Sequence, residues 1–279
     1  MRGRGGAVRR ATATTTLVAC LGLAGCSPAT DGGAAGPDAS APSASVDATT
    51  ALRERCLSAI PDDAELEALT LPGRTGGEVE AARIGPATSD TVAVLLPQIS
   101  GLCGWGRWAA AAAGQAGITS LLVNPCGYGE STCPDDADAD PLNEVAPAVA
   151  RARDELGASR VVLLGTSMGG SLTVMAVAAG ADVDAWADVS GPPAWEGTDL
   201  ADLGPRLAAG GVPDGLVVMA PSDGDAIFAA ARDLARAAGV PFVAGRSGHG
   251  WELLVDPVEG TATRIGRRLV ALAADTDAG

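Results

Sequence analysis

The chain has one histidine, no lysine and no pair of cysteines at Cys-x-x-Cys spacing. Structural zinc sites combine several His and Cys ligands, so we expect no metal and no other cofactor. Its 19 basic residues are all arginine, against 34 acidic residues. Four arginines lie within the first ten residues, which leaves a net charge of −19 on the rest of the chain. This charge argues against nucleic acid as a partner and against direct binding to anionic lipid.

Residues 1–25 have the pattern of an export signal. The four early arginines form a positive region, and residues 11–25 form a mildly apolar stretch that is too short to span a membrane. Leu23-Ala24-Gly25-Cys26 resembles a bacterial lipoprotein box, which implies that Cys26 becomes the acylated first residue. Ordinary secretion with cleavage elsewhere is the alternative. The pair Arg9-Arg10 leaves both general and twin-arginine export open.

Residues 26–50 consist mostly of Ala, Ser, Pro, Gly, Asp and Thr and show no apolar period. Such a segment cannot bury enough apolar surface to order itself, so we expect a flexible tether. Residues 51–279 are then a single folded domain. The sequence predicts an exported protein that is lipid-anchored to the outer face of the cell membrane, with the lipid as its only membrane contact.

One motif in the folded part indicates catalysis. Gly165-Thr166-Ser167-Met168-Gly169 follows the apolar run 161–164 and precedes a stretch, 171–177, that can continue as a helix. A strand, then Gly-x-Ser-x-Gly, then a helix is the context of a nucleophile elbow, in which a sharp turn exposes the serine hydroxyl. The pattern alone also fits a glycine-rich turn with an ordinary capping serine.

The histidine and two aspartates extend this pattern. His249 lies between two glycines, after the strand-like run 240–244, and Asp223 and Asp225 follow the apolar run 216–220. The chain order is therefore Ser, Asp, His, with the acid and the base each in a loop just after a strand. A serine needs a base to become a good nucleophile, and this order supplies one.

On these residues the chain resembles the α/β-hydrolase family over about residues 65–275. The segment 91–97 looks like the family's third strand and 118–124 like its fourth, while Cys126-Gly127-Tyr128-Gly129-Glu130-Ser131 is close to the family's Gly-x-Gly-x-Ser turn. The resemblance implies an α/β fold with a mainly parallel central sheet and helices on both faces. About 25 residues separate the runs 183–190 and 216–220, so we expect little or no lid.

The resemblance also assigns roles. Ser167 attacks an acyl carbonyl, His249 is the general base, and an aspartate orients the imidazole. We choose Asp225 over Asp223, because Asp225 is followed by Ala-Ile-Phe, similar to the family's entry into the next helix. The oxyanion would be held by the backbone N–H groups of Met168 and Ile99.

Four cysteines remain after the predicted leader and Cys26, and an even number in an exported domain favours disulfides. Three connectivities are possible. We pair Cys126 with Cys133, which flank a short turn-rich loop, and this leaves Cys56 with Cys103.

The sequence thus predicts a monomeric serine hydrolase that cleaves a small or medium acyl ester through an acyl-enzyme, at an open site near Trp105, Trp195 or Trp251. An acyltransferase, thioesterase or amidase would use the same three residues. A lipoprotein that keeps the fold only for binding is the alternative from another class.

The lipoprotein box generates the first prediction. Intact-mass analysis of the membrane fraction should find Cys26 as the first residue, carrying lipid, and Cys26→Ala should release the domain or block its processing. A soluble protein that begins at another residue would refute the anchor.

Overall fold

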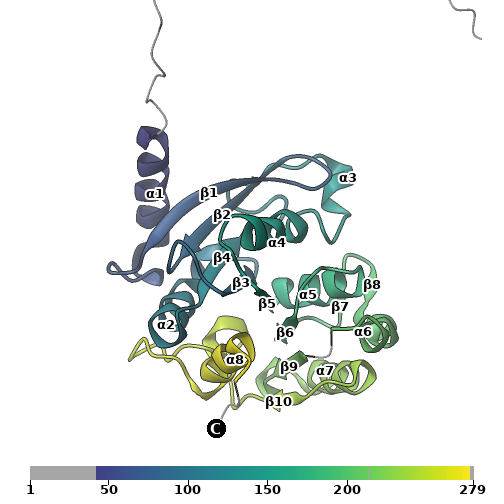
Figure 1. The fold of residues 1–279 in the computed structure, drawn as a ribbon. Coiled ribbons are helices and arrows are strands. Elements are labelled where there is room, and N and C mark those ends of the chain that lie inside the picture. The colour runs from purple at the N-terminus through teal and green to yellow at the C-terminus, as the bar shows by residue number, and fades with distance from the viewer. Residues whose placement is uncertain (1–41, 213, 277–279) are drawn as a thin grey trace, which may run out of the picture. The chain divides into compact units, whose positions relative to one another are not determined.

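The computed structural model describes residues 42–212 and 214–276 and has a central sheet of eight strands (Figure 1). The spatial order is β1-β2-β4-β3-β5-β6-β9-β10. Strands β1 and β2 run antiparallel to their neighbours, and all pairs from β4 to β10 are parallel. The strands are Leu66–Pro72 (β1), Glu78–Ile84 (β2), Thr91–Leu96 (β3), Thr119–Val123 (β4), Arg160–Thr166 (β5), Ala185–Val189 (β6), Asp214–Met219 (β9) and Phe242–Ala244 (β10).

The central strands are apolar because both of their faces are covered. Along β5, Val161 and Leu163 pack into one core, and Val162 and Leu164 into the other. Successive side chains of a strand point to opposite faces, so an unbroken apolar run fills two cores at once. The mainly parallel sheet predicted from the sequence is confirmed.

Helices cover the sheet on both faces, as Figure 1 shows. One core contains residues of α1 (Pro42–Cys56), α2 (Gly106–Ala116) and α8 (Arg264–Ala274). The other contains residues of α4 (Val145–Asp154), α5 (Met168–Ala178), α6 (Gly204–Ala209) and α7 (Asp225–Ala238). In the part of the chain that the structure describes, no helix has the length and apolarity needed to cross a bilayer.

Helix α1 begins inside the predicted tether. The expectation that residues 26–50 form one flexible segment is therefore wrong for residues 42–50. Leu52 and Cys56, one turn apart, are buried in a core, and Thr49 Oγ1 accepts a hydrogen bond from Ala68 N of β1 at 2.9 Å. The helix is thus stabilised by docking rather than by apolar periodicity of its own. The predicted leader, Cys26 and the rest of the tether lie outside the described residues.

The connection between β6 and β9 is short, as the sequence predicts. It contains a hairpin of two-residue strands, β7 (Ala194–Trp195) and β8 (Thr198–Asp199), then the 3-10 helix η3 (Leu200–Leu203) and the six-residue α6. Leu200 and Leu207 anchor this segment in the core beside α5 and α7. Among the described residues of this connection, no element is long enough to form a large cover over the sheet's carboxyl edge.

Both predicted disulfides are present. Cys56 at the end of α1 is bonded to Cys103 in the 3-10 helix η2 (Leu102–Trp105). Cys126 is bonded to Cys133 across a loop that follows β4. The first bridge ties the N-terminal helix to the segment just after β3, and the second closes a local loop.

One carboxyl group is buried in the sheet. Asp188 of β6 is 1% exposed, and its Oδ1 accepts a hydrogen bond from Gly191 N at 2.8 Å. A Cβ on Gly170 of α5 would overlap this oxygen, so the glycine makes room for the carboxyl group. Burial raises the pKa of Asp188 from 3.8 to about 7, and the hydrogen bond from Gly191 only partly offsets that effect.

The two disulfides should differ in their effect on stability. Cys56 and Cys103 are 47 residues apart, and Cys126 and Cys133 are 7 apart. The chain-entropy model therefore assigns about 4 kcal/mol to the first bridge and about 2 kcal/mol to the second. We expect urea unfolding to show a larger loss for Cys56→Ser/Cys103→Ser than for Cys126→Ser/Cys133→Ser. The reverse ranking would contradict this assignment.

Asp188 should make stability depend on pH. Its raised pKa means that the native state binds the proton more tightly than the unfolded state. Stability from this group is therefore complete below about pH 4 and is lost as the pH rises to about 7, by at most ~4 kcal/mol. Asp188→Asn keeps an acceptor for Gly191 N but cannot ionise. Urea unfolding of both proteins at pH 4 and pH 7 should show a smaller loss for the variant, and equal losses would contradict the prediction.

Candidate active site

Ser167 lies at a strained turn between β5 and α5. Its backbone angles are φ 51° and ψ −121°, a region that residues with a side chain rarely occupy. A non-glycine residue stays there only when its surroundings force it, and such outliers cluster at functional sites. The half-buried serine directly precedes the first residue of α5, as a nucleophile elbow requires.

The two glycines of the motif are required sterically. A Cβ on Gly165 would overlap the backbone of Gly169, and a Cβ on Gly169 would overlap the carbonyl groups of Leu96 and Pro97. Gly169 N also donates a hydrogen bond to Pro97 O at 2.9 Å. The turn therefore packs directly on the loop that follows β3.

His249 is paired with Asp223. The imidazole Nδ1 lies 2.7 Å from Asp223 Oδ1, and the Asp223 side chain is only 11% exposed. The prediction that Asp225 orients the histidine is therefore wrong. The 3-10 helix η4 (Pro221–Asp223) turns the chain directly after β9 and places Asp223 in the loop, whereas Asp225 is the exposed first residue of α7. There its charge is favourable to the helix dipole.

The acid and histidine loops are joined a second time. Ser222 Oγ donates a hydrogen bond to Gly248 O and accepts one from Gly248 N, both at 3.1 Å. His249 precedes the 3-10 helix η5 (Gly250–Leu253), and its backbone N donates a hydrogen bond to Glu252 Oε2 at 3.1 Å. Sequence reasoning missed Ser222, because nothing but its place beside Asp223 signals this role.

The histidine loop also lies against the elbow. Gly250 follows His249, and a Cβ added to Gly250 would come within 3.4 Å of Thr166 Cβ, directly before Ser167. The structure thus brings Ser167, Asp223 and His249 to the carboxyl edge of the sheet on neighbouring loops. No hydrogen bond joins Ser167 Oγ to the imidazole in the described part of the chain, and such catalytic contacts are often long until substrate binds.

Two backbone N–H groups are available near the serine. Met168 opens α5, and the first N–H groups of a helix have no acceptor within it. Ile99 N, in the loop after β3, has no hydrogen-bond partner among residues 42–212 and 214–276. The bond from Gly169 to Pro97 fixes these two segments side by side.

A small pocket of about 30 Å³ adjoins Met168. Leu96, Leu172, Met175, Tyr128 and Trp195 are among its lining residues, and four carboxylates complete it: Asp138, Asp140, Glu144 and Glu196. Desolvation, with a smaller contribution from the charge of Asp138, raises the pKa of Glu196.

Of the three tryptophans expected near the site, only Trp195 lines this pocket. Trp105 is buried in the core and donates from Nε1 to Leu96 O, while Trp251 packs on Gly104 beside the Cys56–Cys103 bridge.

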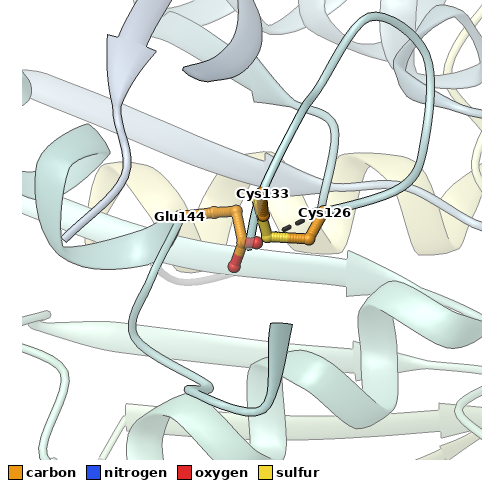
Figure 2. A group of neighbouring side chains, drawn as sticks. All are labelled: Cys126, Cys133 and Glu144. Carbon is orange, nitrogen blue, oxygen red and sulfur yellow. Dashed lines mark hydrogen bonds between the residues drawn. A yellow bond between two sulfur atoms is a disulfide. The ribbon is translucent and has the colours of Figure 1, made fainter. Parts of the chain in front are cut away.

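One group of side chains has ligand atoms close enough for a metal ion. Figure 2 shows Cys126, Cys133 and Glu144, whose sulfur and oxygen atoms lie within 4.8 Å of one another. The sulfurs are joined as a disulfide, and the thiolate is the form that binds metals. Glu144 Oε1 instead accepts a hydrogen bond from Cys126 N at 2.9 Å, and burial raises the pKa of this carboxyl group. The group therefore serves to hold the loop.

Comparisons with solved structures identify similar folds. An esterase of Pyrococcus furiosus has a TM-score of 0.59 and 11% identity, over 81% of this chain and 96% of the esterase. The enol-lactonase of Burkholderia xenovorans has a TM-score of 0.55 and 20% identity, over 73% and 99%. A thioesterase domain of the curacin biosynthetic pathway has a TM-score of 0.55 and 14% identity, over 75% and 98%.

The sequence itself gives no such match. No family model and no curated protein sequence matches the chain. The sheet order, the helices on both faces and these structural neighbours together show that the chain has the α/β-hydrolase fold.

Proposed function

We propose that the protein is a serine hydrolase that cleaves a small or medium acyl ester through an acyl-enzyme. The observation that carries the proposal is the pairing of Asp223 with the chain's one histidine, on a loop packed against a strained serine turn. A glycine-rich structural turn has no need of a serine at positive φ. A binding protein of the same fold has no need of the Asp–His pair.

The proposed reaction passes through an acyl-enzyme. Ser167 Oγ attacks the acyl carbonyl while His249 Nε2 takes its proton, and the carbonyl oxygen becomes an oxyanion facing the N–H groups of Met168 and Ile99. His249 then gives the proton to the leaving group, and the ester bond breaks. A water molecule, activated by the same imidazole, attacks the acyl-enzyme and releases the acid and free Ser167.

Asp223 favours the charged imidazole formed in these steps. Its Oδ1 contacts Nδ1, and its Oδ2 is buried without a hydrogen-bond partner in the described residues. A buried carboxylate with one partner depends on that partner for compensation of its charge. When His249 takes the proton of Ser167, the imidazolium forms next to the Asp223 carboxylate, which has little other solvation.

Size and shape favour a modest substrate. The pocket beside Met168 has apolar side chains but a volume of only about 30 Å³, and the connection from β6 to β9 is short. A long acyl chain would need a larger cover. The names of the structural neighbours, an esterase, an enol-lactonase and a thioesterase, support cleavage of an acyl bond and keep thioester hydrolysis as a second candidate.

The proposed setting is outside the cytoplasm. Two disulfides support an oxidising compartment, and Cys26 supplies the proposed lipid anchor. The anionic domain is then repelled by an anionic membrane surface. It acts as a monomer on a small soluble or surface substrate.

Steady-state kinetics on p-nitrophenyl esters of increasing chain length test the proposal. Ser167→Ala and His249→Ala should each lower kcat by about 10⁴, and the double variant should be little worse than either, because the two groups act as one unit. Full activity of Ser167→Ala would refute the mechanism. Activity that rises steadily to long chains would contradict the proposed substrate size.

The two aspartates give a matched pair for the acid. Asp223→Asn should lower kcat by about 10³–10⁴, because an amide favours the wrong imidazole tautomer. Asp225→Asn, two residues away and exposed at the start of α7, should change kcat by no more than about twofold, as a surface substitution does. The opposite ranking would exclude Asp223 as the acid.

A further inference from the structure

A glutamine links the two loops that the proposed mechanism depends on. Gln98 follows β3 by two residues and sits next to Ile99, the proposed oxyanion donor. Its Oε1 accepts a hydrogen bond from Trp251 N at 3.4 Å, two residues after His249. The side chain therefore reaches from the oxyanion loop to the histidine loop.

Gly250 makes this contact possible. A Cβ at position 250 would overlap Gln98 Oε1, and the residue has φ +56°, which also favours glycine. The same Cβ would lie 3.4 Å from Thr166 Cβ. Three residues thus meet at one point: Gln98 through its side-chain amide, Thr166 before Ser167, and Gly250 after His249.

The backbone of Gln98 is held on its other side. Gln98 O accepts a hydrogen bond from Gly101 N at 2.9 Å, and the adjacent Pro97 O accepts from Gly169 N at 2.9 Å. Leu102 N donates to Asn124 Oδ1 at 2.8 Å, which fixes the end of the loop to the residue that follows β4. Because the backbone of Gln98 is held in place, its side chain can fix the position of the histidine loop relative to the oxyanion loop.

The histidine loop is supported on its opposite side by the acid loop. Ser222 holds Gly248, and Asp223 holds His249. The histidine loop meets the oxyanion loop at Trp251 N and Gly250, and the Trp251 ring also packs on Gly104 of the following 3-10 helix. Without the glutamine acceptor, the imidazole would keep its acid partner but could move relative to Ser167 and the oxyanion donors.

From these contacts we infer that Gln98 is a positioning residue, which holds the histidine loop in a fixed position relative to the oxyanion loop. The inference rests on the proposed function, because it concerns the same site. Misplacement of reacting groups by about 1 Å can cost about 10²-fold in rate. Loss of the link should therefore reduce kcat by about 10–100-fold and leave KM nearly unchanged.

Gln98→Met tests the link with a side chain of similar length whose thioether sulfur is only a weak acceptor. The control is Ser100→Ala, an exposed position in the same loop. Each protein is assayed for kcat, KM and melting temperature. NMR of the imidazole adds a readout independent of catalysis, because one histidine gives one unambiguous set of signals.

We expect Gln98→Met to broaden the imidazole signals and to speed exchange of the Nδ1 proton several-fold, while Ser100→Ala leaves them unchanged. Gln98→Glu, which restores an acceptor for Trp251 N, should recover sharp signals. Unchanged imidazole signals in Gln98→Met would overturn the inference, as would a kcat within about twofold of the unmodified protein. If the unmodified protein hydrolyses no ester but its imidazole still responds to Gln98→Met, the proposed function fails and the positioning role of Gln98 stands.

Discussion

The close approach of α5 to the end of β3 is the constraint on which the site depends. Gly169 packs on the carbonyl groups of Leu96 and Pro97 with no room for a Cβ, and Gly165 packs on Gly169 in the same way. This packing holds Ser167 at a backbone conformation that an unconstrained serine would leave. It also brings the first N–H of α5 beside the loop that carries Ile99. One contact between backbones thus positions the proposed nucleophile and both proposed oxyanion donors.

The parallel sheet supplies the remaining groups. Strands β3, β5, β9 and β10 run in the same direction, so the loops after them meet at one edge of the sheet. Hydrogen bonds between loops then refine the arrangement. Ser222 and Asp223 connect the acid loop to the histidine loop, and Gln98 connects the histidine loop to the oxyanion loop. The strands bring the loops to the same edge of the sheet, and these side chains hold the loops in position relative to one another.

The sequence predicts most of this fold and less of the site. Continuous apolar runs identify the buried strands, and the short linkage between Cys126 and Cys133 identifies one disulfide and, by elimination, the other. The choice between Asp223 and Asp225 depends on whether the chain makes a 3-10 turn or enters a helix directly after β9, and both are compatible with the same residues. The role of Gln98 could not be predicted either, because it depends on the approach of two loops about 150 residues apart in the chain. The sequence does not predict helix α1, because the helix is supported by the docking of Leu52 and not by a repeating apolar pattern.

Labelling with a fluorophosphonate tests the central claim most directly, since this probe forms a covalent bond with a serine that a neighbouring base has activated. The account predicts that the native protein gains one adduct, which peptide mapping locates on Ser167, and that protein unfolded in denaturant gains none. An adduct on another serine, or no adduct on the native protein, would contradict the assignment of Ser167 as the nucleophile.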